Sequence, residues 1–352
     1  MDNIPTISVI DIFSGIGGLT HGLYLEGFNI IAGYDADNQC KYAYEQNTPG
    51  AKFIHKKIQD IKPREIIDQF PTNSIKVIVG CAPCQPFSRY SIKKSSEDER
   101  WKLVPKFGEL ATSVKPLIIS MENVPDLVKY KDGILYQKFT DRLKQNGYHV
   151  TTYPKVYAPD YGIPQERTRL VMFASLLGPV DLMEPTHQPD EYVSVEDTIG
   201  DLVPIKAGET SSIDRVHKAC NLSHKNLQRI QSSTPGGTWD DWDEDLIAKC
   251  HLKPSGSRYK SVYGRMRWDT PSPTITTQYY GFGNGRFGHP EQDRAISLRE
   301  GAMLQTFPAD YRFADPKDPI YFNSLGKYIG NAVPVKLAQI IGKSIKNHLE
   351  NQ

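Results

Sequence analysis

The sequence lacks the features that mark membrane, secreted and polycationic proteins. No apolar run approaches the roughly 18 residues that a membrane-spanning helix needs. The first residues place no basic segment ahead of an apolar one, so no secretory signal is predicted. Formal net charge is only +1, which excludes a chain that is basic throughout. No repeat or low-complexity tract is present. We therefore expect a soluble, cytoplasmic protein without a membrane partner.

Cysteine is scarce, and its pattern excludes a disulfide framework. The five cysteines are an odd number without framework spacing, so reduced thiols are expected: Cys40, Cys81, Cys84, Cys220 and Cys250. Cys81 and Cys84 form a C-x-x-C pattern, which suits a redox pair or half of a zinc site. No second C-x-x-C and no histidine pair accompanies it, so we expect no metal.

The 352 residues, 39% of them hydrophobic and 24% charged, suffice for one large domain and a smaller one. In the first half, short β-branched runs alternate with helical patterns, which predicts a parallel sheet with helices on both faces. The expected strands span residues 7–13, 30–34, 76–79 and 117–121. The expected helices span residues 18–26, 38–47, 63–70 and 101–114.

Composition changes after about residue 174. From Gly178 to Gly288 the chain is rich in Pro, Gly, Ser, Asp and Tyr, which predicts an irregular second domain. The end of the chain returns to helical spacing and is expected to pack onto the first domain. Its apolar face comprises Ala338, Ile341, Ile345 and Leu349. We predict one domain from residues 1–178 and 325–352, and another from residues 179–324.

Small residues follow the first expected strand. In the run Phe13–Leu19, glycines leave backbone N–H groups open to a ligand. Thr20 replaces the third glycine of the dinucleotide pattern, which disfavours a hydride-transfer cofactor. Asp35 closes the next strand, where an acid commonly binds ribose hydroxyls. Asp60 is a candidate acceptor for an exocyclic amine, although a tight turn with two surface acids is the simpler alternative.

A thiol and three charged groups come at later strand ends. Cys84 lies in a Pro-flanked loop after a buried strand, a position that favours reactivity over core filling. A nucleophilic thiol needs partners that stabilise its thiolate and the charge on its target. Glu122 follows the next strand. Arg167 and Arg169, spaced i and i+2, are expected on one side of a further strand.

One segment of the second domain is basic and aromatic. From Lys249 to Trp268 there are six Lys or Arg residues and no Asp or Glu, interleaved with Tyr259 and Tyr263. Such a patch can bind phosphates without changing the global charge. A solvated surface segment is an equal alternative for this stretch alone.

Together these motifs make the chain resemble the DNA cytosine-5 methyltransferase family over nearly its full length. Six motifs occur in the family's order, which makes coincidence improbable. They are Phe13–Leu19, Pro83-Cys84-Gln85, Glu122-Asn123-Val124, Gln165-x-Arg167-x-Arg169, Arg294-x4-Arg299-Glu300-x4-Gln305-Thr306-Phe307-Pro308 and Gly330-Asn331-Ala332-Val333-Pro334.

The resemblance implies a Rossmann-like, S-adenosylmethionine-dependent α/β domain with a smaller target-recognition domain. It implies that the Cys84 thiolate adds to C6 of cytosine, so that C5 can accept the methyl group. Glu122 would contact N3 and the amino group, offsetting the charge that develops. Arg167 and Arg169 would brace Cys84 and the cytosine O2. Loss of the C5 proton and expulsion of Cys84 would complete turnover.

The resemblance also assigns binding residues. The cytosine must be flipped out of a duplex to be reached. The segment from about 180 to 290 would therefore bind a specific double-stranded DNA sequence. Family members often carry Glu and a bulky residue at the ribose position, where this chain has Asp35-Ala36. The cofactor pocket would comprise Phe13, Ser14, Gly15, Gly17, Leu19, Asp35, Asp60, Pro83, Leu103, Asn331 and Val333. DNA would meet Ser88, Arg258, Arg265, Arg267 and Arg286, while Arg299 would support the domain's scaffold.

If the chain belongs to this family, we expect a monomer. We also expect a cognate restriction endonuclease that acts on the same DNA site. Three alternatives stay open. An RNA cytosine methyltransferase would use the same scaffold, but the long recognition segment favours duplex DNA. A catalytically silent DNA-binding protein would be free to lose Cys84 and Glu122. A thiol oxidoreductase would need both Cys81 and Cys84.

Overall fold

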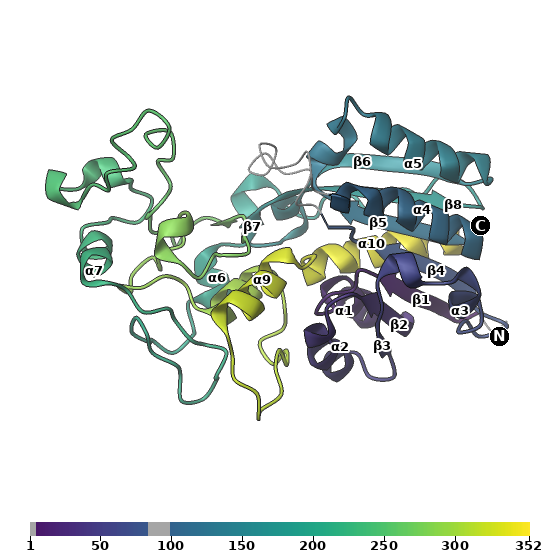
Figure 1. Ribbon diagram of the computed structural model, residues 1–352, viewed down its shortest axis with the longest axis horizontal. Helices are drawn as coiled ribbons and strands as arrows, with labels where there is room; N and C mark the ends of the chain where they lie inside the picture. The colour runs from purple at the N-terminus through teal and green to yellow at the C-terminus, as the bar shows by residue number, and fades with distance from the viewer. Residues whose placement is uncertain (1–4, 84–98) are drawn as a thin grey trace. The chain divides into compact units, whose positions relative to one another are not determined.

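The computed structural model of the chain describes residues 5–83 and 99–352 (Figure 1). The chain divides into two compact units. Unit 1 comprises Met1–Tyr161, Thr168–Pro185 and Val333–Gln352, and unit 2 comprises Gly162–Arg167 and Thr186–Ala332. Apart from the short segment Gly162–Arg167, the divisions fall after residues 185 and 332, where the sequence suggested 178 and 324.

A seven-stranded sheet forms the centre of unit 1, in the order β3-β2-β1-β4-β5-β8-β6. Neighbouring strands from β3 to β5 run parallel, as the alternation of strands and helices predicts. β8, from the later part of the chain, pairs antiparallel with both β5 and β6, so it runs against the other strands. The strands are β1 (Ile7–Ile12), β2 (Asn29–Asp35), β3 (Lys52–His55), β4 (Ile75–Gly80), β5 (Ile118–Asn123), β6 (His149–Tyr157) and β8 (Thr168–Ser175).

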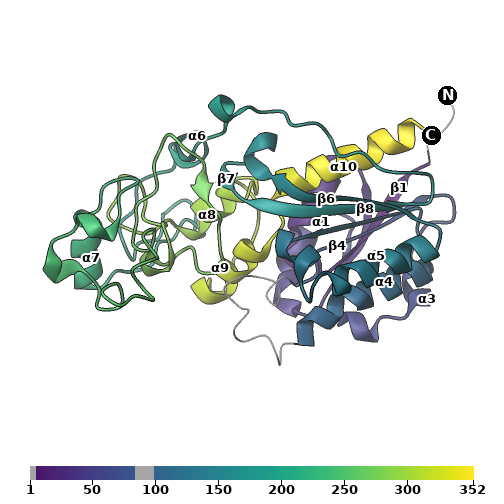
Figure 2. The same ribbon diagram turned by 90° about the horizontal axis from the view of Figure 1, so that it is seen from above.

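Helices cover both faces of this sheet, because alternate strand residues are apolar on each side. Ile10, Ile78 and Met172 belong to one core cluster, which the helices α3, α4 and α5 complete. On the opposite face, His348 of α10 contacts Ser175 of β8. Figure 2 shows α10 on one side and α4 and α5 on the other. The helices of unit 1 are α1 (Gly18–Leu25), α2 (Lys41–Asn47), α3 (Pro63–Ile67), α4 (Leu103–Val114), α5 (Ile134–Gln145) and α10 (Val335–Glu350).

The C-terminal helix α10 packs on α1, which confirms the expectation that it returns to the first domain. Gly22 of α1 makes this approach possible. A Cβ added at Gly22 would lie 2.4 Å from both the Ala338 Cβ and the Val335 carbonyl oxygen. The two helices therefore meet nearly backbone to backbone, with the start of α10 against Gly22 of α1.

The strand directions bring several polar residues to one edge of the sheet. β1, β2, β4 and β5 all end at this edge because they are parallel. β8 begins at the same edge because it is antiparallel, with Leu170 opposite Asn123. Residues that follow four strands, and residues that open a fifth, are thereby gathered from distant parts of the sequence.

Unit 2 is built mainly from loops, as its composition predicts. Its two-stranded sheet pairs β7 (Gln165–Glu166) with β9 (Ser272–Pro273). Its apolar clusters are small; one is formed by Ile230, Phe282 and Ala295. The helices are α6 (Val195–Ile199), α7 (His224–Gln231), α8 (Leu298–Leu304) and α9 (Phe322–Asn331). None of the described helices is long and apolar enough to cross a membrane.

Candidate active site

The glycine loop after β1 is tied to the end of β2 by a carboxylate. The Gly15 N–H donates to Asp35 Oδ2 at 2.9 Å, and the Asp37 N–H donates to Asp35 Oδ1 at 2.9 Å. Gly15 and Gly17 have φ values of +50° and +91°, which favour glycine. A Cβ at Gly15 would meet no atom within 4 Å, so this side of the loop is bare.

Buried polar groups lie beneath this loop. Asp11, fully buried in β1, accepts a hydrogen bond from Thr20 Oγ1 at 2.6 Å. Burial, together with the nearby Asp35, raises the pKa of Asp11 to about 8 against the hydrogen bond from Thr20, so Asp11 holds a proton at neutral pH. Burial also raises the pKa of Asp35, against the two N–H donors that lower it. The buried Ser14 Oγ has no hydrogen-bond partner among the described residues.

Asp11 is not among the residues predicted from the sequence, and Thr20 was noted there only as a departure from the dinucleotide pattern. The signal that could have found Asp11 is an acid inside an otherwise apolar strand, because such a group needs a proton or a partner.

The other predicted cofactor residues fall in both units. Phe13 has a φ of +67°, and its ring centroid lies 6.4 Å from that of Phe107. Asp60 is exposed in a short 3-10 turn (Ile58–Asp60), and Leu103 opens α4. Leu19 and Val333 are buried, and Pro83 is partly buried. Asn331 ends α9 in unit 2, whereas the rest of this set belongs to unit 1.

The predicted acid Glu122 is buried at the end of β5 with 2% of its surface exposed. Arg169 of β8 forms an ion pair with it, with Nε 3.1 Å from Oε1. The thiol of Cys81, which follows β4, donates to Oε2 at 2.8 Å. The sheet thus brings Glu122 and Arg169 together as the sequence predicted, and it adds Cys81 to them.

Asn123 fixes the loop that leads to Cys84. Its Nδ2 donates to the Ala82 carbonyl at 2.9 Å, and its Oδ1 accepts from the Val124 N–H at 2.9 Å. The side chain is buried, so these bonds hold the end of β4 against the end of β5. Cys84 and Ser88 lie outside the described residues.

Arg167 has different partners from Arg169, and the prediction that both lie on one strand is wrong. β7 ends at Glu166 and β8 begins at Thr168, so Arg167 sits at the break. It belongs to unit 2, where it donates to the Gln165 side chain at 3.2 Å and the Ile275 carbonyl at 3.2 Å. This guanidinium is buried among polar partners of unit 2, whereas Arg169 pairs with Glu122 in unit 1.

Unit 2 contains four arginines predicted to meet DNA, and Arg265 is buried with 5% exposed. Its guanidinium donates to the carbonyls of Ile230, Ser233, His289 and Gln292 and pairs with Asp293. Because these donors are all directed into the unit, the geometry gives Arg265 a role in holding loops together.

The remaining three arginines differ in exposure. Arg286 is partly buried and donates to the Gly237 carbonyl at 2.6 Å; burial lowers its pKa. Arg267 is exposed and pairs with Asp269, with Nη2 2.6 Å from Oδ2. Arg258 is exposed. Of this set, Arg258 and Arg267 present charge at the surface.

A stack of rings underlies the basic segment. His251 is buried between Trp239, at 4.4 Å between ring centroids, and Tyr263, at 5.8 Å. Lys260 lies over the Trp239 ring, 4.2 Å from its centroid. In the same segment Tyr259 is 49% exposed, and so the segment presents an aromatic ring at the surface.

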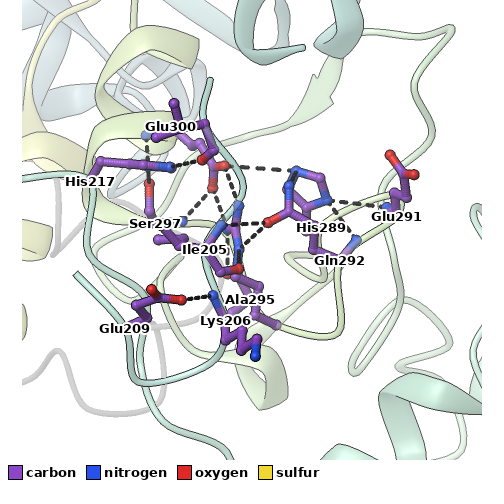
Figure 3. A network of polar contacts seen from close by, with 12 residues as sticks. Ile205, Lys206, Glu209, His217, His289, Glu291, Gln292, Ala295, Ser297 and Glu300 are labelled. Carbon is purple, nitrogen blue, oxygen red and sulfur yellow. Dashed lines mark hydrogen bonds and ion pairs between the residues drawn. The ribbon is translucent and has the colours of Figure 1, made fainter. Parts of the chain in front are cut away.

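A buried ion pair anchors the scaffold of unit 2, and Figure 3 shows the polar network around its acid, Glu300. Arg294 and Glu300 have side-chain exposures of 0% and 1%, and Nη2 lies 2.6 Å from Oε1. Hydrogen bonds from Arg294 and from the Ser297 N–H hold the pKa of Glu300 at about 2, against the effect of burial. Arg299 pairs with Asp214 at 2.6 Å and so supports the scaffold, as the sequence analysis expected.

His289 belongs to the same network. Its Nδ1 accepts hydrogen bonds from the backbone N–H groups of Glu291 and Gln292, at 3.1 Å and 2.9 Å, which requires that nitrogen to be unprotonated. Burial lowers the pKa of His289 to about 4, so the ring is neutral at neutral pH. No group of three or more His, Cys, Asp or Glu side chains is placed to hold a metal ion in the described ranges.

The chain is similar over nearly its full length to known DNA methylases. A Type II methylase of Herpetosiphon aurantiacus, M.HgiDII, is 53% identical over 343 residues, covering 97% of this chain and 96% of that protein. M1.HphI, a Type II methyltransferase of Haemophilus parahaemolyticus, is 29% identical and covers 97% and 87%. A prophage-encoded E. coli protein described as a DNA modification methyltransferase has the same fold, with a TM-score of 0.76 at 23% identity, covering 98% of this chain and all of that one.

The model of the C-5 cytosine-specific DNA methylases matches residues 7–347. The match includes the glycine loop, the ends of β4 and β5, the start of β8 and all of unit 2. The chain therefore belongs to the C-5 cytosine-specific DNA methylase family and is a DNA cytosine methyltransferase.

Proposed function

We propose that this enzyme transfers a methyl group from S-adenosylmethionine to C5 of a cytosine flipped out of a specific double-stranded DNA sequence. In this proposal unit 1 binds the cofactor and carries the chemistry, and unit 2 binds the target. The observation that carries it is the buried Glu122 at one sheet edge with Arg169, next to the loop that leads to Cys84.

The residues after β1 and β2 fit the proposed cofactor. The bare side of Gly15 leaves room for a ligand, and the buried Ser14 Oγ has an unmet hydrogen bond among the described residues. Each oxygen of Asp35 accepts one N–H and keeps a lone pair for a ribose hydroxyl. When bound, S-adenosylmethionine supplies an electrophilic methyl group.

The chain's own residues would prepare the cytosine. The Cys84 thiolate adds at C6, and the electron pair of the C5–C6 bond then makes C5 nucleophilic. Glu122 holds N3 and the amino group, which offsets the charge that this addition creates. After C5 is methylated, loss of its proton restores the double bond and expels the Cys84 thiolate. Arg169 holds the Glu122 carboxylate in place throughout.

Unit 2 would bind the duplex through the basic segment from Lys249 to Trp268. Its exposed cations suit phosphates, and the exposed Tyr259 ring suits the contact of a base or sugar. The internally bonded Arg265 is left out of this surface. Because the relatives include Type II methylases, we propose a monomeric cytoplasmic enzyme that protects a site cut by a cognate restriction endonuclease.

Bisulfite sequencing of DNA from a methylation-free host that expresses the protein tests this function. One sequence motif should contain a cytosine that bisulfite does not convert, because it is methylated. DNA from the host that expresses Cys84→Ala should contain no such cytosine. Cys220→Ala is the matched control, because its thiol lies in unit 2 and burial raises its pKa to about 11. Methylation that persists in Cys84→Ala would overturn the proposed chemistry.

An oligonucleotide with 5-fluorocytosine at the identified position gives a second readout. The fluorine cannot leave as a cation, so a covalent complex should accumulate with the wild type and be absent with Cys84→Ala. Failure of the wild type to form it, while it still methylates ordinary DNA, would contradict addition by the thiolate.

A further inference from the structure

The Cys81 thiol, which the sequence analysis treated as one half of a C-x-x-C pattern, contacts the proposed acid. Cys81 follows the last residue of β4, Gly80, and Glu122 lies in the neighbouring strand β5, where Gly80 pairs with Met121. The register therefore puts Cys81 beside Glu122, and Sγ lies 2.8 Å from Oε2.

The carboxylate of Glu122 has few other partners. Arg169 approaches Oε1 to 3.1 Å, yet Oε1 accepts no hydrogen bond from any described residue. The Cys81 thiol is thus the hydrogen-bond donor that the described part of the chain provides for this buried group. A carboxylate that is 2% exposed cannot rely on water to fix its orientation.

We propose that Cys81 is a positioning residue, which holds the Glu122 carboxylate in the orientation that meets the cytosine N3 and amino group. The inference rests on the proposed function. Oε2 keeps a second lone pair while it accepts from Cys81, so the hydrogen bond leaves the carboxylate able to contact the base. The torsion of the carboxylate is otherwise soft, and a contact on each oxygen fixes it.

Asn123 supports the same geometry from the neighbouring position. Its bond to the Ala82 carbonyl at 2.9 Å fixes the residue after Cys81 to β5. The distance between the Cys81 Sγ and the Glu122 carboxylate is therefore set by two adjacent strands and one side-chain bond. The role of Cys81 is to donate a hydrogen bond, so a hydroxyl at this position should replace it.

Cys81→Ala and Cys81→Ser in the full-length protein test the inference. Cys81→Ala should lower kcat for methyl transfer about tenfold, and it should slow formation of the covalent complex with 5-fluorocytosine DNA by a similar factor. The KM for S-adenosylmethionine should change less than twofold, because the glycine loop is untouched. Cys81→Ser retains a donor and should recover kcat to within about threefold of the wild type.

The outcomes separate the two proposals. Wild-type kinetics in Cys81→Ala would overturn the positioning role and leave the proposed function standing. A Cys81→Ala protein that no longer binds S-adenosylmethionine or has lost its thermal transition would make Cys81 a structural residue, which also overturns it. Equal losses in Ala and Ser would do the same. A wild type that neither methylates DNA nor forms the covalent complex would overturn both proposals.

Discussion

The two units hold themselves together in different ways. In unit 1 a seven-stranded sheet buries apolar residues on both faces, and its polar site lies where strands end. In unit 2 the apolar clusters are small, and buried guanidinium groups of Arg265 and Arg294 connect loops through backbone carbonyls. The polar groups of unit 1 are available for chemistry, whereas many of those in unit 2 are used by the fold.

This contrast shows that the role of a charged residue can be inferred only from its burial and its hydrogen-bond partners. Glu122 and Arg294 are both nearly inaccessible. Glu122 has one hydrogen-bond donor among the described residues, while Arg294 donates to Glu300 and to the carbonyls of Ile205 and Ala295. A buried charged group whose hydrogen-bonding capacity is only partly used indicates a functional site. One whose capacity is fully used indicates a structural role.

The largest expected effect comes from breaking the scaffold pair. Arg294→Met leaves the Glu300 carboxylate buried without its partner and frees the Ile205 carbonyl. We expect a loss of about 3–5 kcal/mol in the free energy of unfolding, since an uncompensated buried charge remains. Urea denaturation followed by tryptophan fluorescence measures this, because Trp239 and Trp242 lie in unit 2.

Arg267→Met is the matched control, because Arg267 also pairs with an acid but is exposed. Its urea midpoint should equal that of the wild type. If both variants lost similar stability, the distinction between scaffold and surface arginines in unit 2 would be wrong.

The sequence predicts unit 1 far better than unit 2, for physical reasons. Strand and helix periodicity locates β1, α1, β2, β4 and β5 within a few residues, because each must bury one regular face. Because parallel strands end at the same edge of a sheet, Glu122 is predicted at the edge where β8 begins, and Arg169 is the second residue of β8. The sequence does not reveal that β8 is antiparallel, since direction depends on the connection and not on composition.

The sequence could not separate the arginines of unit 2. Arg258 and Arg265 lie seven positions apart in one basic stretch, and both suit phosphate by type. Only the fold shows that Arg265 faces the carbonyls of Ile230 and His289 while Arg258 is exposed. Loops have no period, so burial in a loop-built unit cannot be inferred from spacing.

A smaller loss of stability is expected when His289, the neutral histidine in the network around Arg294 and Glu300, is protonated. Burial lowers the pKa of His289 to about 4, from about 6.5 in the unfolded chain. Below pH 6.5 the unfolded state binds the proton first, so stability present above that pH is lost as pH falls toward 4. Roughly 2–3 kcal/mol should disappear over this window. Urea midpoints at pH 7.5 and pH 5 measure it.

His289→Asn separates this group from the other histidines. Its amide oxygen can still accept the N–H groups of Glu291 and Gln292, but it does not titrate. The variant should therefore lose less stability than the wild type between pH 7.5 and 5. An identical pH dependence in both proteins would show that His289 is not the group responsible.

The smallest effect is expected on DNA affinity, when an exposed arginine of the basic segment is removed. This experiment compares the exposed Arg258 with the buried Arg265. If Arg258 contacts a phosphate, Arg258→Ala removes one released counterion. The slope of log affinity against log salt should then fall by about 0.9, with a modest loss of DNA affinity at low salt. Fluorescence anisotropy with a labelled duplex that contains the methylated sequence, at several salt concentrations, measures both. Arg64→Ala removes the same charge from an exposed position in α3 of unit 1 and should leave the slope unchanged.

Arg265→Ala should lower the urea midpoint of the protein, because the hydrogen bonds of the Arg265 guanidinium are internal. If Arg265→Ala kept its stability and reduced the salt slope, Arg265 would be a phosphate contact and the comparison between buried and surface arginines would fail at that residue.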